Sequence, residues 1–281
     1  MAVTASSPEI GDLLRAWRQR RNLSQLELSL GASVSSRHLS FVETGRARPS
    51  REMILRLAEE LEVPLRERNP LLLAAGFAPV YTERPLDSPE MANVRDALDR
   101  FLRAHEPYPA IVVDRYHNLV ASNDALDVLL EGVAPELLEP PANGMRIALH
   151  PLGMAPRTLN LAEWSAHLLH RVSREAQITG DPRLLSLYDE LIQYPGVEPG
   201  PVHGELQSAD IVLPLRLEDP DGEGELAFFS TLSTFGTAVD ITLSELAIEA
   251  FYPANAQTAL RLLRGVDPDR AGPPAGRLGR T

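Results

Sequence analysis

Residues 23–50 read LSQLELSLGASVSSRHLSFVETGRARPS, and this stretch decides the fold of the first part of the chain. Ser24 and Ser35 each precede a segment with helical spacing of apolar residues, and serine is favoured at helix N-caps. Gly45 stands where a left-handed residue would end the second helix. The stretch therefore predicts two helices joined by a short turn around residues 32–35.

The second of these helices has an unusual composition. Its buried stripe consists only of Leu39 and Val42, while its first turn carries Ser36, Arg37 and His38. A helix that only filled a core would have more aliphatic side chains there. A helix that enters the major groove of DNA needs hydrogen-bonding groups on its N-terminal turn. The pattern favours DNA recognition.

The charge of the surrounding segment agrees with this interpretation. Residues 10–51 contain eight arginines against Asp12, Glu27 and Glu43, a net charge of +5 within a chain of net charge −12. A basic segment joined to an acidic remainder is typical of a small polyanion-binding module attached to another domain. A solvated arginine-rich helix face would give the same charge. We expect an all-α domain of five helices over 10–80, after a flexible N-terminus at 1–9.

The motif resembles that of a known family. Leu23-Ser-Gln25, Ala32-x-Val34-Ser35 and Leu39-Ser-x-x-Glu43-x-Gly45-x-x-x-Pro49-Ser50 are similar to the λ repressor-like, or XRE-type, helix-turn-helix. Ser29 and Ser33 depart from the usual alanine and glycine, so we expect a slightly strained turn. A helical bundle without DNA binding is the alternative.

The resemblance implies roles for particular residues. Glu43 would form a structural ion pair with Arg18, which ties the third helix to the first. Phosphate contacts would come from Gln25, Ser35, Arg46 and Arg48. Base edges would be faced by Ser36, Arg37, His38, Ser40 and Phe41. Arginine suits the O6 and N7 atoms of guanine.

Composition limits the remaining possibilities. The chain has 281 residues, 44% of them hydrophobic, no cysteine, and no lysine among its 27 basic residues. Disulfides, thiolate metal sites and a cysteine nucleophile are therefore excluded. The sequence contains no apolar run of the roughly 20 residues that would span a bilayer, and no signal-peptide pattern at its start. We expect a soluble cytoplasmic protein with no membrane association.

The second domain is predicted to be α+β. A polar segment with two prolines at 81–90 is the expected linker, 91–265 the domain, and 266–281 a disordered tail. We expect a small antiparallel sheet with flanking helices. The predicted strands are 110–113, 119–121, 211–217 and 225–235. The predicted helices are 91–104, 161–178, 182–194, 242–252 and 255–264, the fourth because Thr242-Leu-Ser-Glu245 reads as a capping box.

The resemblance extends into this domain. Glu106-Pro-Tyr-Pro109, Asn160-Leu-Ala-Glu-Trp164 and Ser230-Thr-Leu-Ser-Thr-Phe-Gly-Thr237 look like the MmyB-like regulators. That likeness implies a PAS-like domain that senses a ligand, with a fatty acid as the suspected class and no other cofactor. No feature of the composition points to that ligand.

Support from the residues themselves for a pocket is weaker. The strand 225–235 is apolar on both faces, so one face could line a pocket and the other a core or a dimer surface. Two ordinary packed layers would give the same pattern. The predicted pocket residues are Trp164, Phe228, Leu232, Phe229 and Phe235.

The residues also bear on two other functions, metal binding and catalysis. Glu163, His167 and His170 share a helix face, but no further histidine or cysteine completes a metal site, so we expect none. The sequence has no G-x-S-x-G elbow, no P-loop and no G-x-G-x-x-G, and nothing in it points to a Ser/His/Asp triad, so we expect no enzyme. The leading hypothesis is a ligand-responsive transcriptional regulator that binds a double-stranded DNA operator as a homodimer. The alternatives are a second domain that only dimerises or docks another protein, and an enzyme with a DNA-binding head.

Overall fold

The computed structural model describes residues 9–200, 212–219 and 224–264. Nearly all of the predicted flexible N-terminus and of the predicted tail lies outside the described residues. So does Ile211, the first residue of one predicted strand. The chain divides into two compact units, and each has a hydrophobic core of its own.

The two units divide mainly at one point of the chain, and two short later segments belong to the first unit. The break after Arg84 falls inside the predicted linker 81–90. The first unit holds the residues up to Arg84 together with Gln177–Gly180 and Thr237–Ser244, and the second holds Pro85–Ala176, Asp181–Gly236 and the residues from Glu245 onward.

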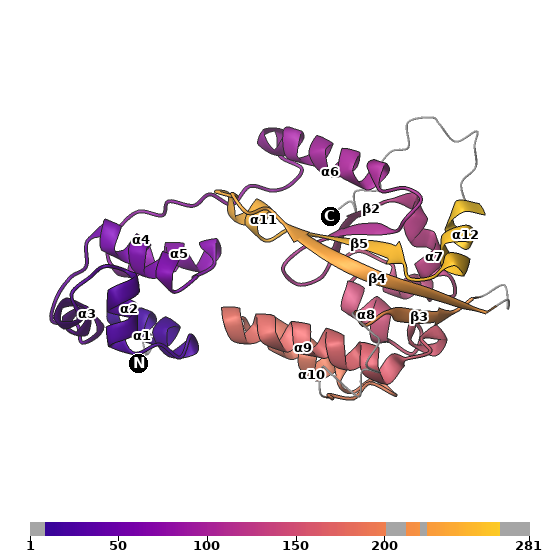
Figure 1. The fold of residues 1–281 in the computed structure, drawn as a ribbon. Coiled ribbons are helices and arrows are strands. Elements are labelled where there is room, and N and C mark those ends of the chain that lie inside the picture. Colours follow the sequence, from indigo (N-terminus) through magenta and orange to yellow (C-terminus); the bar gives the residue numbers. More distant parts are fainter. Residues whose placement is uncertain (1–8, 201–211, 220–223, 265–281) are drawn as a thin grey trace, which may run out of the picture. The chain divides into compact units, whose positions relative to one another are not determined.

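Five α-helices occupy the part of the first unit that precedes residue 75, as predicted. They are α1 (Ile10–Arg20), α2 (Gln25–Gly31), α3 (Ser36–Glu43), α4 (Arg51–Glu60) and α5 (Leu65–Ala74), indigo to purple in Figure 1. Their starts follow from the sequence: Ser24 and Glu27 form a capping box, and the hydroxyls of Ser35 and Ser50 accept from backbone N–H groups three residues on. Each cap satisfies a donor that the helix itself leaves unpaired.

The turn between α2 and α3 is tight. Ser33 has a φ of 53°, in the left-handed region that a non-glycine residue rarely adopts. The backbone N–H of Val34 donates to the Ser29 carbonyl at 2.9 Å across this turn. The strain expected at Ser33 is therefore present, and the turn keeps its form because α2 and α3 pack against a common core.

That core consists of side chains from all five helices. Leu14 and Trp17 of α1 lie with Leu39 and Val42 of α3, and all four are at most 5% exposed. The other buried members of this cluster are Leu28, Ala32, Met53, Ile54, Leu57, Ala58, Leu61, Val63, Leu71 and Leu72.

A five-stranded antiparallel sheet forms the centre of the second unit, in the order β2-β1-β5-β4-β3. The strands are β1 (Ala110–Val113), β2 (Leu119–Ser122), β3 (Leu215–Glu218), β4 (Glu225–Thr234) and β5 (Ala247–Pro253). The predicted PAS-like α+β class is thus confirmed, with one strand more than predicted.

The additional strand corrects one prediction. Residues 242–252 were expected to be a helix, but only α11 (Ile241–Ser244) is helical and 247–253 form β5. The cap is Asp240, whose side chain accepts from the Leu243 N–H at 3.5 Å, and Glu245 instead pairs with Arg115 at 2.9 Å. Ile248, Phe251 and Tyr252 suit a strand better than a helix. The segment also pairs with β1 on one edge and β4 on the other, and this pairing overrides the helix-start signal at 242–245.

A second correction concerns the strand predicted over 211–217. Among the described residues it is β3, which begins only after Pro214. Leu215 and Leu217 are buried and Arg216 and Glu218 exposed, so the predicted alternation holds. β3 is an edge strand of the sheet, where a preceding proline is tolerated.

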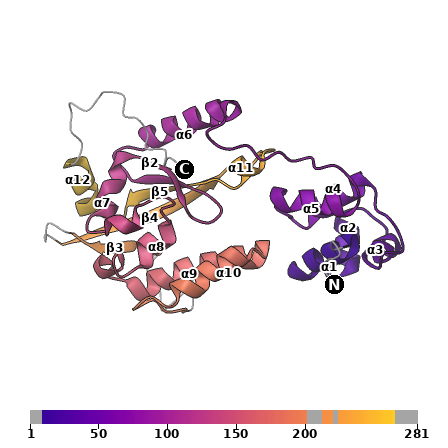
Figure 2. The same ribbon diagram turned by 180° about the vertical axis from the view of Figure 1, so that it is seen from behind.

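Helices cover both faces of this sheet, as Figures 1 and 2 show from opposite sides. α6 (Ala92–Ala104) lies over one face, and α8 (Gly144–Leu149), α9 (Leu161–Thr179) and α10 (Pro182–Leu191) lie over the other. α7 (Asp127–Leu130) and α12 (Ala256–Arg264) lie towards one end. Single 3-10 turns occur at Pro89–Met91, Asp124–Leu126, Pro135–Leu137 and Ala155–Arg157.

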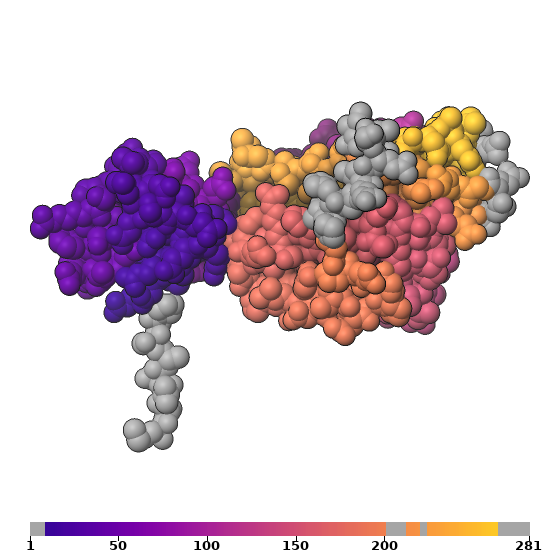
Figure 3. All heavy atoms as spheres, turned by 60° about the horizontal axis from the view of Figure 1, so that its bottom comes forward, coloured from indigo at the N-terminus to yellow at the C-terminus, as the bar shows by residue number. Residues whose placement is uncertain are grey.

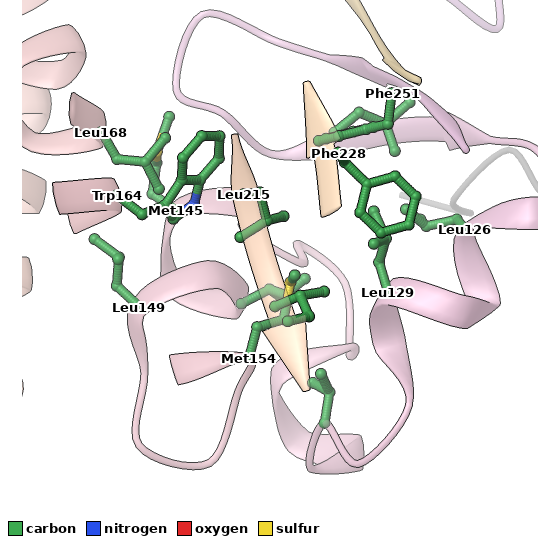
Figure 4. Packing of buried hydrophobic residues seen from close by; sticks show 14 of the residues in the cluster. Leu126, Leu129, Met145, Leu149, Met154, Trp164, Leu168, Leu215, Phe228 and Phe251 are labelled. Atoms are coloured by element: carbon green, nitrogen blue, oxygen red, sulfur yellow. The ribbon is translucent and has the colours of Figure 1, made fainter. Parts of the chain in front are cut away.

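The main core of the second unit lies between the sheet and α8, α9 and α10. Figure 4 shows Phe228 and Phe251 of the sheet in the same layer as Leu126, Leu129, Met145 and Trp164 from the helical side. In the space-filling view of Figure 3, the salmon-coloured residues of α9 and α10 form the outer surface on this side. Within the described residues, no helix has the length and apolar character that a bilayer crossing needs.

Candidate DNA interface and ligand cavity

The first turn of α3 presents polar groups to solvent. Ser36, Arg37 and His38 are all exposed, whereas Leu39 and Val42 of the same helix are fully buried. Ser35 is exposed too, and its hydroxyl accepts from the His38 N–H at 3.3 Å. The polar turn is therefore held by its cap and is free to meet another molecule.

The remaining predicted base contacts lie one turn further on. Ser40 and Phe41 are half-buried, and the Arg37 guanidinium lies 5.4 Å from the centre of the Phe41 ring. A guanidinium stacked on an aromatic ring loses less freedom when it meets a second partner. Arg46 and Arg48 are exposed in the loop that follows Gly45, which has a φ of 71°.

A buried carboxylate joins α3 to α1. The Glu43 side chain is fully buried and accepts from Arg18 Nε at 2.7 Å and Arg18 Nη2 at 2.9 Å, a bidentate pair. Gln25 Nε2 donates to the same carboxylate at 2.8 Å, and Arg15 Nε lies 3.6 Å away. Burial alone would raise the pKa of Glu43, but the hydrogen bonds from Arg18 and Gln25 and the nearby positive charges lower it. The structure thus places Arg18 and Glu43 together, as the family resemblance implied.

Gln25 has a different setting from the one predicted. We expected a phosphate contact, and the structure places its amide on Glu43, half-buried. Gln25 therefore helps to hold α2 on α3, and a phosphate contact from it remains a prediction.

The second unit contains an apolar cavity between the sheet and the helical layer. The volume of this cavity is about 80 Å³. The strands β1, β2, β3 and β5 and the helices α7, α8 and α9 all contribute to its wall. The lining residues are Ile111, Val113, His117, Leu119, Leu126, Leu129, Leu130, Gly144, Met145, Ile147, Ala148, Met154, Trp164, Leu168, Leu215, Glu249 and Phe251.

Only one of the five predicted pocket residues, Trp164, lines this cavity. Phe228 is fully buried in the adjoining core, and Phe229 stacks on Tyr252 with ring centres 5.3 Å apart. Leu232 is 48% exposed and Phe235 half-buried, and neither lines the cavity. Only the first part of β4 is covered, so the outer part of its apolar pattern faces solvent. A ligand contact from these four residues therefore stays a prediction that this cavity does not support.

Two of the lining residues that sequence reasoning missed are polar, His117 and Glu249. His117 belongs to the turn between β1 and β2. Glu249 lies on β5, which was predicted to be a helix. A charged residue within the apolar run of 246–252 was the available signal.

Within the described residues, no group of three or more histidine, aspartate or glutamate side chains is placed to hold a metal ion. His167 instead stacks on Trp164 with ring centres 5.6 Å apart, and burial lowers the pKa of His167.

Comparison with known proteins agrees with this two-part architecture. Residues 14–68 match the helix-turn-helix family, and residues 94–264 match the MmyB-like transcription regulator ligand binding domain. The chain belongs to the MmyB-like transcription regulators. It is a DNA-binding transcriptional regulator with a ligand-binding domain.

Each of the individual relatives of this MmyB-like regulator matches less than half of the chain. Two uncharacterized HTH-type transcriptional regulators of Mycobacterium tuberculosis, from strains CDC 1551 and H37Rv, are each 28% identical over 115 residues, 41% of this chain and 74% of theirs. A solved restriction-modification controller protein from Aeromonas hydrophila is 32% identical, covers 21% of this chain and 89% of its own, and has a TM-score of 0.20.

Proposed function

We propose that this regulator reads a DNA operator through α3 and changes its affinity when a small apolar molecule occupies the cavity. The cavity supports the proposal that the second unit senses a ligand. Its walls come from strands on one side and helices on the other, and they are almost entirely apolar. A domain used only for docking predicts a flat exposed apolar face instead.

The DNA contacts are proposed from exposure and chemistry. Ser36, Arg37, His38, Ser40 and Phe41 share the outward side and first turns of α3 and would face base edges. Arg46 and Arg48 follow directly, and with Ser35 they would contact phosphates. One such helix reads only a few base pairs, so we propose that two copies bind half-sites roughly 34–36 Å apart, or a multiple of that.

A fatty acid is the ligand class that the family resemblance raises, and the cavity constrains it. Its volume of about 80 Å³ is below the roughly 150 Å³ of a dry cavity that holds benzene. A long acyl chain would therefore enter only if the walls moved. Met145 and Met154 line the cavity, and the flexible methionine side chain repacks readily.

The proposal is tested with the full-length chain. Small molecules released from the purified protein are identified by mass spectrometry, and operator DNA is titrated with delipidated and with reloaded protein. By linkage, the factor by which the ligand changes DNA affinity equals the factor by which DNA changes ligand affinity.

A cavity-filling variant separates sensing from DNA binding. Ala148→Leu places extra methyl groups in the cavity wall, and Ala162→Leu, on the exposed side of α9, is its matched control. We expect Ala148→Leu to bind operator but to lose the response to ligand, and Ala162→Leu to keep both. An unchanged response in Ala148→Leu would contradict the sensor proposal, and a monomer on DNA by light scattering would contradict the dimer.

A further inference from the structure

The cavity has one polar side. His117 and Glu249 are 3% and 9% exposed, while every other lining residue is apolar or glycine. Burying a carboxylate and an imidazole against hydrocarbon costs free energy and adds nothing to packing. Their presence beside the cavity therefore indicates a use other than stability.

These two side chains are the ends of a charged network that runs along α9. Arg171 Nη1 donates to Glu249 Oε2 at 3.0 Å, and Arg171 Nε lies 3.5 Å from Glu175 Oε1. Glu175 Oε2 lies 2.9 Å from His117 Nε2. Arg171 and Glu175 are four residues apart and so share one face of the helix. The helix thus holds a strand residue and a turn residue in place at the same side of the cavity.

The backbone at His117 is specially arranged. Its φ is 64°, a left-handed conformation that costs free energy for a non-glycine residue. Asp114 Oδ1 accepts from the backbone N–H groups of Tyr116 and Asn118 at 2.8 and 2.9 Å, and Asn143 Nδ2 donates to the Tyr116 carbonyl at 2.7 Å. The surroundings therefore impose the conformation that presents His117 to the cavity.

The charges of the network decide which head group it can receive. Arg171 already lies between two carboxylates, so its charge is compensated before any ligand arrives. The charges of Arg171, Glu175 and Glu249 sum to −1. A ligand carboxylate would add a further negative charge beside Glu249, whereas a hydroxyl group could donate to that carboxylate.

We propose that the cavity takes a small apolar molecule whose polar end is a hydroxyl group, and that Glu249 accepts its hydrogen bond. The small volume excludes a bulky polar end, and a hydroxyl adds one heavy atom. An ammonium group is disfavoured because it would lose its full hydration in a cavity whose other walls are apolar, and the one carboxylate there already shares its charge with Arg171. This inference rests on the proposed sensing function and specifies the chemistry of its ligand.

Three probes of similar size separate the possibilities. They are 1-hexanol, its isomer methyl pentyl ether, which has the same atoms but no O–H donor, and hexanoate, which carries a negative charge. Binding to the delipidated full-length chain is followed by calorimetry and by the fluorescence of Trp164, which lines the cavity. We expect 1-hexanol to bind at least about tenfold more tightly than the ether, as for a hydrogen bond to a charged acceptor.

A paired substitution removes the acceptor together with Arg171, its partner on α9. Glu249→Leu would strand Arg171 and risk unfolding, so it is combined with Arg171→Met. The control is Glu163→Leu, an exposed glutamate of the same helix. The double variant should bind 1-hexanol and the ether equally, and the control should keep the tenfold preference.

The outcomes distinguish a failure of the hydroxyl assignment from a failure of the proposed sensing function. Hexanoate binding as tightly as 1-hexanol, or a hydroxyl preference that survives the double substitution, would overturn the head-group assignment while the sensor stands. If no probe binds, the hydroxyl assignment fails. If in addition no small molecule is released from the purified chain, the sensing function fails with it.

Discussion

Replacing Glu43 by alanine should destabilise the first unit strongly. The carboxylate is fully buried, and Arg18, which donates to it twice, has a side chain only 13% exposed. Removing one member of a buried ion pair leaves the other charge without compensation, at a cost of about 3–5 kcal/mol. For a domain of this size, each kcal/mol lowers Tm by roughly 4–8 °C, so the loss should be about 12 °C or more.

The two tryptophans allow this to be measured in the full chain. Trp17 lies in the core of the first unit and Trp164 in that of the second. In a Trp164→Phe background, the fluorescence of Trp17 therefore follows the first unit alone. Glu59→Ala, at an exposed position of α4, is the control and should change the free energy of unfolding by less than about 0.5 kcal/mol.

Acidification provides a second check on the same residue. The pKa of Glu43 in the folded chain lies below its ordinary value of 4.5. Its stabilisation is therefore complete above that value and is lost as the pH falls through the lower, folded pKa. The difference between the parent chain and Glu43→Ala should narrow on acidification. An unchanged Tm at pH 7 together with lost DNA binding would refute the structural role.

Three further substitutions test the proposed interface. Arg37→Ala should weaken binding to the operator by about 1–3 kcal/mol and leave binding to unrelated DNA unchanged; equal losses on both DNAs in a fluorescence anisotropy titration would make Arg37 a phosphate contact. Arg46→Ala should weaken binding to all sequences alike and lower the slope of log K against log salt by about 1, and a sequence-dependent loss would contradict this. Ser33→Gly should raise the stability of the first unit by up to about 1 kcal/mol, since φ is 53° there; a lower denaturation midpoint would show that the serine is not strained.

Local signals were sufficient to predict the first unit. The hydroxyls of Ser24, Ser35 and Ser50 act within three residues of their own position, and apolar spacing on α3 separates the inward from the outward side. The pair of Arg18 and Glu43 came from the family resemblance, since nothing within one helix indicates a partner 25 residues away.

Contacts between residues far apart in the sequence explain why the helix predicted at 242–252 and most of the pocket residues differ from the structure. Thr242 to Glu245 has the composition of a helix start, yet Glu245 pairs with Arg115, 130 residues earlier. Residues from seven helices and strands likewise form the cavity wall. The sequence predicted Trp164 as a lining residue, but not Phe251 or His117, because their approach to one cavity depends on contacts between distant segments. The sequence pattern shows which side chains are apolar. Which of them meet around one cavity depends on the order of the strands in the sheet.

The position of β5 has a consequence for biosynthesis. It is the last strand to be made, yet it lies between β1 and β4 in the middle of the sheet. During translation, β1 has an open edge from the time residue 113 is added until residue 247 follows, and such edges invite pairing with other chains. Domains usually fold in the order of their synthesis. The ligand-binding unit of a ribosome-bound chain should therefore depend on chaperones until residues 247–253 are made, and a chain that ends before 247 would lack the centre of its sheet.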